Sequence, residues 1–129
     1  KVTHLSEQAD PFYEHSLVVK MRAFILSRAD QALTAEDVAE YLNMSVRTLR
    51  RRLADIGMCF NDIRLEVRMQ AATRYLKHSK LSIERIANVV GYSDQASFTR
   101  AFQKWSNDTP DAIRRKHRQQ QNLTIPISP

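Results

Sequence analysis

The sequence is poor in the residues that build disulfide-rich, zinc-binding or turn-rich proteins. It has one cysteine, Cys59, with two glycines and four prolines in 129 residues. A single cysteine excludes an internal disulfide framework and a cysteine-rich zinc site. So few glycines and prolines disfavour a β-sandwich or barrel, which needs many tight turns. No apolar run approaches the ~18 residues of a membrane span. These absences predict a soluble, mostly helical, intracellular protein with no membrane partner.

Charge is distributed unevenly along the chain. The formal net charge is +6 and the pI is about 9.8, which makes nucleic acid the leading class of partner. Residues 1–44 carry four bases and seven acids, a net of −3, whereas residues 45–129 carry sixteen bases and seven acids, a net of +9. The densest cluster is Arg47 with Arg50, Arg51 and Arg52. Clustered positive charge suits a phosphate-binding surface, but one such run is also typical of a solvated helix face.

Apolar spacing and capping residues predict seven helices and no strands. We expect these helices over about 11–29, 35–42, 45–56, 61–76, 82–90, 94–105 and 110–118. Asp10 and Pro11 are expected to open the first helix as N-cap and first helical residue. Residues 1–10 are expected to be a linker or tail. Residues 119–129, rich in glutamine and then interrupted by proline, are expected to form a disordered tail.

An internal repeat relates two parts of the chain. Residues 33–45 align with residues 81–93 at an offset of 48, with identical residues at Leu33/Leu81, Glu36/Glu84, Ala39/Ala87 and Ser45/Ser93. One residue is then inserted, and Leu49, Arg51 and Leu53 align with Phe98, Arg100 and Phe102. Two copies of a capped helix, a short turn and a second capped helix predict two helix-turn-helix units. The second helix of such a unit can lie in the DNA major groove.

Each second helix is predicted to have an outward face opposite its core face. On a helical wheel Val46, Leu49 and Leu53 face inward, whereas Arg47 and Arg51 point away. In the second unit Phe98, Phe102 and Trp105 face inward, whereas Ala96, Arg100 and Gln103 point away. Each helix therefore presents an outward i, i+4 pair near its N-terminus, Arg47/Arg51 and Ala96/Arg100. Arginine bound to O6 and N7 of guanine is the commonest specific base contact.

The stretch from Ile86 to Phe102, IANVVGYSDQASFTRAF, identifies a resemblance. It is similar to the I-A-x-x-x-G-[FY]-x-[DS]-x-x-x-F-x-R-x-F signature of the C-terminal DNA-binding domain of the AraC/XylS family of bacterial transcription regulators. The resemblance covers about residues 15–116. It implies an all-α, seven-helix domain with two homeodomain-like helix-turn-helix subdomains joined by a long linker helix. We expect these subdomains at 11–60 and 78–118, with the linker helix at 61–77.

The resemblance also implies a function and a set of site residues. It implies sequence-specific binding to duplex promoter DNA and regulation of transcription initiation, in the bacterial cytoplasm at the nucleoid. The implied partners are RNA polymerase and a small-molecule effector bound by an upstream domain that this chain does not include. The base-reading positions fall on Arg47, Arg50, Arg51, Gln95, Ala96, Thr99 and Arg100. Weaker phosphate contacts are expected from Ser45, Thr48, Ser93, Lys104 and Arg114, and capping is also expected of the two serines.

Two departures from the family pattern concern the turns that follow the second helices. The first of these helices is one residue shorter before Gly57 than in many members. Asn107 replaces the usual glycine of the second exit turn, and asparagine tolerates the left-handed backbone conformation that glycine adopts there.

Two alternatives belong to other functional classes. The first is an enzyme, in its strongest form a DNA-repair methyl acceptor. Cys59 has no partner cysteines and lies in an apolar turn where core packing is the ordinary role. The four histidines show no metal-binding spacing, and the sequence has no glycine-rich phosphate loop, so no catalysis, metal or cofactor is expected. The second is a helix-turn-helix adaptor that acts through protein–protein contacts. Salt dependence separates it from DNA binding, because phosphate-dominated complexes weaken steeply as salt rises.

Overall fold

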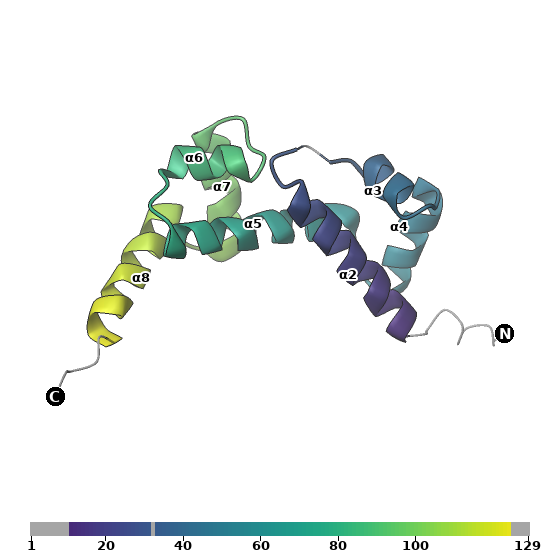
Figure 1. Cartoon of the computed structure of the whole chain (residues 1–129), viewed down its shortest axis with the longest axis horizontal. Helices are drawn as coiled ribbons and strands as arrows, with labels where there is room; N and C mark the ends of the chain where they lie inside the picture. Colours follow the sequence, from purple (N-terminus) through teal and green to yellow (C-terminus); the bar gives the residue numbers. More distant parts are fainter. Residues whose placement is uncertain (1–10, 32, 125–129) are drawn as a thin grey trace. The chain divides into compact units, whose positions relative to one another are not determined.

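The computed structural model describes residues 11–31 and 33–124, and every regular element in that part of the chain is an α-helix (Figure 1). The helices are α2 (Pro11–Ser27), α3 (Ala35–Tyr41), α4 (Val46–Asp55), α5 (Phe60–His78), α6 (Ile83–Val89), α7 (Gln95–Ser106) and α8 (Pro110–Thr124). All seven predicted helices are therefore present, and all but α8, which ends six residues later than expected, agree with their expected bounds to within two residues. None of the helices in the described ranges is long and apolar enough to cross a membrane.

The chain divides into two compact units within α5, between Val67 and Arg68. The first unit contains α2, α3, α4 and the first part of α5, and the second contains the remainder of α5 with α6, α7 and α8. Each unit is therefore one helix-turn-helix pair, α3–α4 or α6–α7, supported by one further helix and by a part of α5. The repeat in the sequence is a repeat in the structure.

The first unit encloses a core of aliphatic side chains. Met21, Val38 and Leu49 are completely buried, and they come from α2, α3 and α4 respectively. Burial of a side chain of this size contributes roughly 1.5–3 kcal/mol. At the edge of this core the Arg64 guanidinium donates to the carbonyl of Leu33 over 2.8 Å, which ties α5 to the segment before α3.

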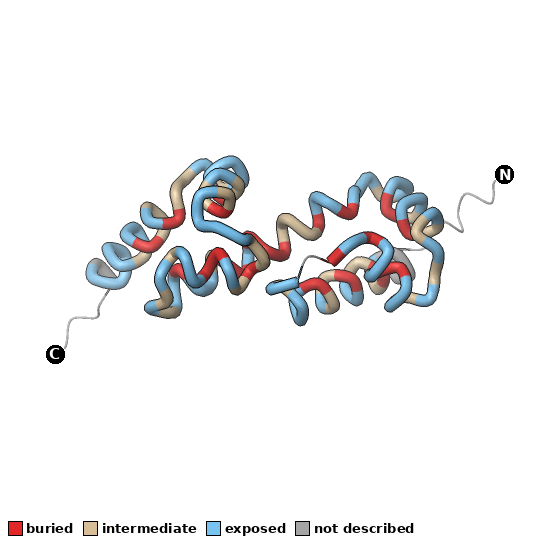
Figure 2. Tube along the Cα trace, turned by 90° about the horizontal axis from the view of Figure 1, so that it is seen from above, coloured by how far each residue is buried: buried red, intermediate tan, exposed pale blue. Residues whose placement is uncertain are grey.

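The second unit has a core built mainly from aromatic rings. Phe98 and Phe102 of α7 are completely buried, and their ring centroids lie 5.7 Å apart. Tyr92 packs edge-on against Phe98 at 5.7 Å. Trp105 lies 5.8 Å from Phe102 but is 36% exposed, so the prediction that Trp105 is buried was wrong. It covers the edge of the core rather than filling it (buried positions are red in Figure 2).

The turns inside the two helix-turn-helix pairs have the same geometry. Asn43 has φ +59° and Gly91 has φ +99°, and these residues correspond at the repeat offset of 48. The next amide donates back to the alanine of the preceding helix, from Met44 to Ala39 over 3.0 Å and from Tyr92 to Ala87 over 2.9 Å. Both turns are left-handed C-terminal caps of the type that favours glycine or asparagine.

The exit turns after α4 and α7 follow the same rule with the residue types exchanged. Gly57 has φ +74° and Asn107 has φ +67°. The prediction that Asn107 tolerates the left-handed conformation is confirmed. Both glycines of the sequence therefore occupy positions with positive φ, and asparagine takes the equivalent position in the other repeat.

The helix N-termini confirm some predicted caps and correct one. The predicted cap at Ser45 is confirmed at the start of α4. Thr34 and Asp37 form a capping box at the start of α3: the Asp37 amide donates to Thr34 Oγ1 over 3.2 Å, and the Thr34 amide donates to Asp37 Oδ2 over 3.0 Å. α7, by contrast, is capped by Asp94 and not by Ser93. The one-residue insertion in the second repeat aligns Ser45 with Asp94 and places Ser93 outside the helix. The predicted cap at Asp10 lies outside the described residues.

Two further expectations fail at the surface. α8 continues to Thr124, so the tail predicted from residue 119 is helical over its first six residues, because glutamine is a good helix former. Residues 125–129 lie outside the described part. Cys59 is exposed, since it lies in the loop between α4 and α5, and the adjacent Phe60 fills the core position at 5% exposure.

Candidate nucleic-acid interface

The outward face of α4 is basic. Arg47, Arg50 and Arg51 are all exposed, whereas Leu49 and Leu53 on the opposite side are at most 1% exposed. No acidic residue lies in the first turn of α4. The core face fixes the rotation of the helix about its axis, so three guanidinium groups extend together into solvent.

The outward face of α7 is smaller and more nearly neutral. Gln95, Ala96 and Arg100 are exposed and Thr99 is half-buried. Phe98 and Phe102 anchor the opposite face. The side chains available here are one carboxamide, one methyl group, one hydroxyl and one guanidinium. This set can donate and accept hydrogen bonds and make apolar contact, which are the interactions used to read base edges.

Equivalent caps hold the N-terminal ends of both helices. The Thr48 amide donates to Ser45 Oγ over 3.0 Å, and the Ser97 amide donates to Asp94 Oδ1 over 2.7 Å. Each cap satisfies one of the free amides of the first turn. The first turn of each helix, which carries Arg47 in α4 and Gln95 with Ala96 in α7, is therefore ordered by a hydrogen bond within three residues of the cap.

Asp94 extends this network along α7. The hydrogen bond from the Ser97 amide, together with a second from the Ser97 hydroxyl and the nearby charge of Arg100, lowers the pKa of the Asp94 carboxyl. Ser97 Oγ lies 3.2 Å from Asp94 Oδ2, and Arg100 Nη2 donates to Ser97 Oγ over 3.4 Å. A carboxylate thus stays ionised beside the outward face and is linked to Arg100 through one serine. The sequence analysis missed this role, although the one-residue insertion before α7 was the available signal.

The expected phosphate-contacting residues lie in different environments. Ser45, Ser93 and Lys104 are exposed, and Thr48 is half-buried. The Ser45 hydroxyl donates to Thr48 Oγ1 over 3.0 Å, so the two hydroxyls form a local pair at the start of α4.

Arg114 does not fit the expectation of a phosphate contact. It is only 8% exposed, and its Nε donates to the carbonyl of Leu76 over 3.1 Å. Its Nη2 lies 3.4 Å from the carbonyl of Tyr75 and 3.3 Å from that of Ser79. The guanidinium caps the C-terminal end of α5, where carbonyls lack helical partners. It is therefore directed at the protein backbone and not at solvent.

Metal-binding groups are scattered. No group of three or more histidine, cysteine, aspartate or glutamate residues within the described ranges could hold a metal ion. The candidate interface consists of hydrogen-bonding and cationic side chains on α4 and α7.

Comparison with known proteins gives a consistent relationship. The family model of a helix-turn-helix domain matches residues 38–116, more than half of the chain. The regulator VqsM of Pseudomonas aeruginosa is 36% identical over 95 residues, which cover 74% of this chain and 29% of VqsM. The regulator VirS of Mycobacterium tuberculosis is 43% identical over 82 residues, which cover 63% of this chain and 24% of VirS. The chain thus spans a quarter to a third of the length of these relatives.

Solved structures share the fold. The C-terminal domain of AraT, a response regulator from Geobacillus stearothermophilus, aligns with a TM-score of 0.69 at 35% identity, covering 78% of this chain and 84% of that domain. The DNA-binding domain of AdpA, solved in complex with a target DNA, aligns at 0.72 with 23% identity, covering 81% of this chain and 96% of that domain. The relatives are transcription regulators rather than enzymes. The chain belongs to the AraC family and constitutes a helix-turn-helix DNA-binding domain of that family.

Proposed function

We propose that this domain binds specific sequences of duplex DNA at promoters and regulates transcription initiation. α4 and α7 act as the two recognition helices and enter successive major-groove segments about one helical turn (~34 Å) apart. Arg47, Arg50 and Arg51 read bases from α4, and Gln95, Ala96, Thr99 and Arg100 read bases from α7.

One observation carries the proposal: the two helices have the same capped start, the same core-facing side and the same exposed outward side. Arg51 and Arg100 occupy equivalent positions of the repeat, and both are exposed. A solvated basic face explains one such helix, but it does not explain why the arrangement is repeated with the second copy nearly neutral. Reading of base edges explains both, because specificity depends on hydrogen bonds and methyl contacts as well as on charge.

Phosphate contacts are proposed for Ser45, Thr48, Ser93 and Lys104, which flank the two outward faces. Such contacts fix the register of a protein on DNA and carry no sequence information directly. Lys104 is the one cation of this set, and each phosphate that Lys104 or an arginine of α4 or α7 neutralises contributes about −0.9 to the slope of log K against log salt, so DNA affinity should fall as salt rises. An adaptor that works through protein contacts would not show this slope.

The decisive experiment is selection of bound duplexes from a random pool, followed by affinity measurements on the selected sequence over a range of salt. We expect two blocks of fixed sequence about ten base pairs apart, with affinity falling steeply as salt rises. A single block would limit reading to one helix. A pool that stays random, or an affinity insensitive to salt, would refute the proposal.

For the whole protein we propose two further partners. RNA polymerase is the partner through which a promoter-bound regulator acts, and a small-molecule effector is the signal that an additional domain would bind. Two observations support these partners: the relatives are longer than this chain, and one of them is named for the use of a small molecule. That relative, the ornithine utilization regulator of Pseudomonas aeruginosa, matches over 30% of its length. Transcription from a promoter carrying the selected sequence, measured with purified polymerase with and without the protein, tests the first partner.

A further inference from the structure

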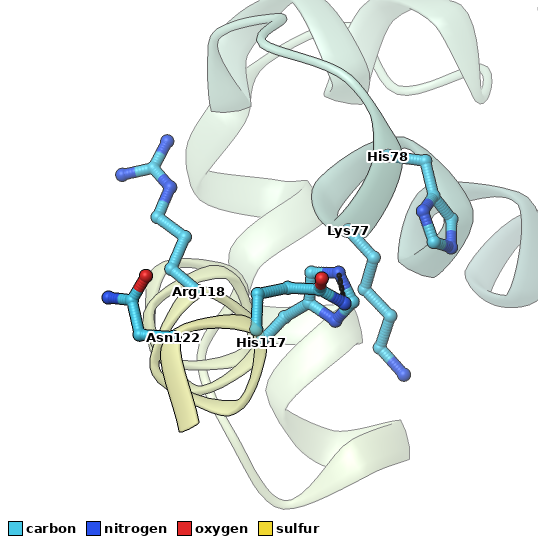
Figure 3. Close-up of a pocket in the computed structure, with 6 residues that line it drawn as sticks. Lys77, His78, His117, Arg118 and Asn122 are labelled. Atoms are coloured by element: carbon cyan, nitrogen blue, oxygen red, sulfur yellow. Dashed lines mark hydrogen bonds between the residues drawn. The ribbon is translucent and has the colours of Figure 1, made fainter. Parts of the chain in front are cut away.

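The end of α5 and the middle of α8 form an open pocket on the second unit. It encloses about 510 Å³ and is lined by Lys77, His78, His117, Arg118, Gln121 and Asn122 (Figure 3). Lys77 and His78 belong to the last turn of α5, and the other four belong to α8. No residue of the recognition helix α7 lines it. Figure 3 shows the side chains of Lys77 and His117 extending alongside each other from the two helices.

The lining of this pocket is polar and carries positive charge but no negative charge. It holds two permanently charged side chains, two imidazoles and two carboxamides, and it includes no carboxylate. The imidazoles of His78 and His117 lie edge to face with ring centroids 5.3 Å apart. Gln121 Nε2 lies 3.5 Å from His117 Nε2. Every lining group can donate a hydrogen bond when the histidines are protonated.

The positive charge here is not offset by neighbouring acids. On α8 Arg115 pairs with Asp111 over 3.0 Å, and Lys116 pairs over 2.8 Å with Asp108, which lies just before α8. Both of these acids are therefore engaged with cations outside the pocket. Within the described part of the chain, neither Lys77 nor Arg118 forms an ion pair. Burial lowers the pKa of the Arg114 guanidinium, and the charge of Arg118, one helical turn later, lowers it further.

We propose that this pocket binds a phosphate group through Lys77, His78 and His117, while Arg118, whose side chain extends away from Lys77 in Figure 3, adds positive charge to the lining. A tetrahedral oxyanion offers several acceptor oxygens to donors from the two helices, and it offsets the repulsion among the cations. Because the pocket lies outside the recognition helices, the phosphate comes either from the DNA backbone beyond the base contacts or from a phosphorylated small molecule. The chemistry of the site is the same in both cases.

Nuclear magnetic resonance of the histidine side chains tests the pocket directly. Inorganic phosphate is added at constant ionic strength, with chloride as the reference anion. We expect saturable shifts of the His78 and His117 signals on addition of phosphate, because the bound anion contacts both imidazoles. His15, which is exposed on α2 and outside the pocket, serves as the internal control and should not move.

Two double variants give the matched comparison. Lys77→Gln with Arg118→Gln removes both permanent charges from the pocket, and Lys80→Gln with Arg115→Gln removes the same charge from exposed positions outside it. The first variant should abolish the phosphate-induced shifts and the second should keep them. Equal loss in both variants, or histidine signals that respond alike to phosphate and chloride, overturns the proposal.

Binding of the selected duplex then distinguishes the two sources of phosphate. If the DNA backbone occupies the pocket, the pocket variant lowers the magnitude of the salt slope by about 1 relative to the control variant, and DNA shifts the His78 and His117 signals. If a small molecule occupies it, phosphate shifts these signals while both variants bind DNA with the same salt slope. This test is independent of the base-reading assignment, which fails or holds with the variants of α4 and α7.

Discussion

Replacing Arg114 separates its structural role from the phosphate contact suggested by its charge. Arg114→Met keeps most of the apolar stem but removes the guanidinium and its three contacts to the carbonyls of Leu76, Tyr75 and Ser79. A hydrogen bond from a charged group contributes roughly 1.5–3 kcal/mol. Two of the three contacts are long, at 3.3 and 3.4 Å, so we count them as about one full bond beside the Nε contact. Two such bonds give an expected loss of unfolding free energy of about 3–6 kcal/mol.

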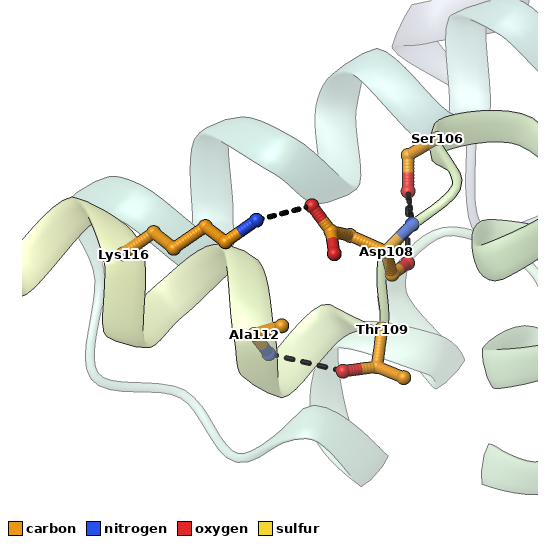
Figure 4. Close-up of polar contacts among 5 residues, drawn as sticks. All are labelled: Ser106, Asp108, Thr109, Ala112 and Lys116. Carbon is orange, nitrogen blue, oxygen red and sulfur yellow. Dashed lines mark hydrogen bonds and ion pairs between the residues drawn. The ribbon is translucent and has the colours of Figure 1, made fainter.

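The neighbourhood of Arg114 supports a structural effect confined to the second unit. At the start of α8 the Ala112 amide donates to Thr109 Oγ1 over 3.1 Å, and Lys116 Nζ donates to the Asp108 carboxylate (Figure 4). These contacts hold the α7–α8 connection, whereas Arg114 joins α8 to the end of α5. A positive charge at a partly buried helix C-terminus also interacts favourably with the helix dipole. Arg114→Lys retains that charge and loses the planar fork, so it should be destabilised less than Arg114→Met.

The assay is urea unfolding followed by tryptophan fluorescence. Trp105 is the only tryptophan in the sequence and belongs to α7, so its signal reports the second unit. Arg114→Met should unfold at lower urea but, under conditions where it remains folded, bind the selected DNA within about twofold of wild type. Unchanged stability together with a tenfold loss of affinity and a shallower salt slope would show that Arg114 contacts phosphate and would refute the structural role.

Three other predictions follow from the recognition helices and turns. Arg51→Ala and Arg100→Ala should each weaken DNA binding by roughly 1–3 kcal/mol and relax preference at one base position, whereas Arg115→Ala should not; selection of bound duplexes with each variant checks this. Asp94→Asn should be less stable than wild type at neutral pH. Because the folded-state pKa of Asp94 is lowered, the carboxylate stabilises the fold above its unfolded pKa, and the advantage should disappear as pH falls through the folded pKa; an unchanging difference would contradict this. Gly57→Ala should cost about 1 kcal/mol in thermal unfolding, since φ is +74° and nothing lies within 4 Å of an added Cβ, and Gly57→Asn should cost less.

The sequence predicted the features of the fold that depend on local pattern. Apolar spacing located every helix in the described ranges, and the repeat located both helix-turn-helix pairs. The positive φ at Asn107 followed from the tolerance of asparagine for a left-handed backbone. These features are readable because each is decided within a few residues of chain.

Features that depend on distant contacts were not readable. The burial of Arg114 is decided by carbonyls 35 to 39 positions earlier in the chain, which no local pattern reveals, so its charge suggested a surface role. Trp105 fits the inward face of a helical wheel, but the core ends at Phe102. The base-reading residues stay predictions, which the variants of Arg51 and Arg100 test.

The two recognition helices divide affinity and specificity unequally under the proposed function. α4 presents three exposed arginines and no acid in its first turn, so it supplies most of the attraction for the phosphate backbone as well as donors for guanine. α7 presents one arginine beside an ionised cap at Asp94, which reduces its nonspecific attraction for phosphate. A helix with little net attraction binds well only where its hydrogen bonds and methyl contacts match the bases. The repeat thus combines α4, which binds DNA of many sequences, with α7, which binds well only to a matching sequence. The basic charge of the chain explains the nonspecific binding by α4 but not the specificity of α7.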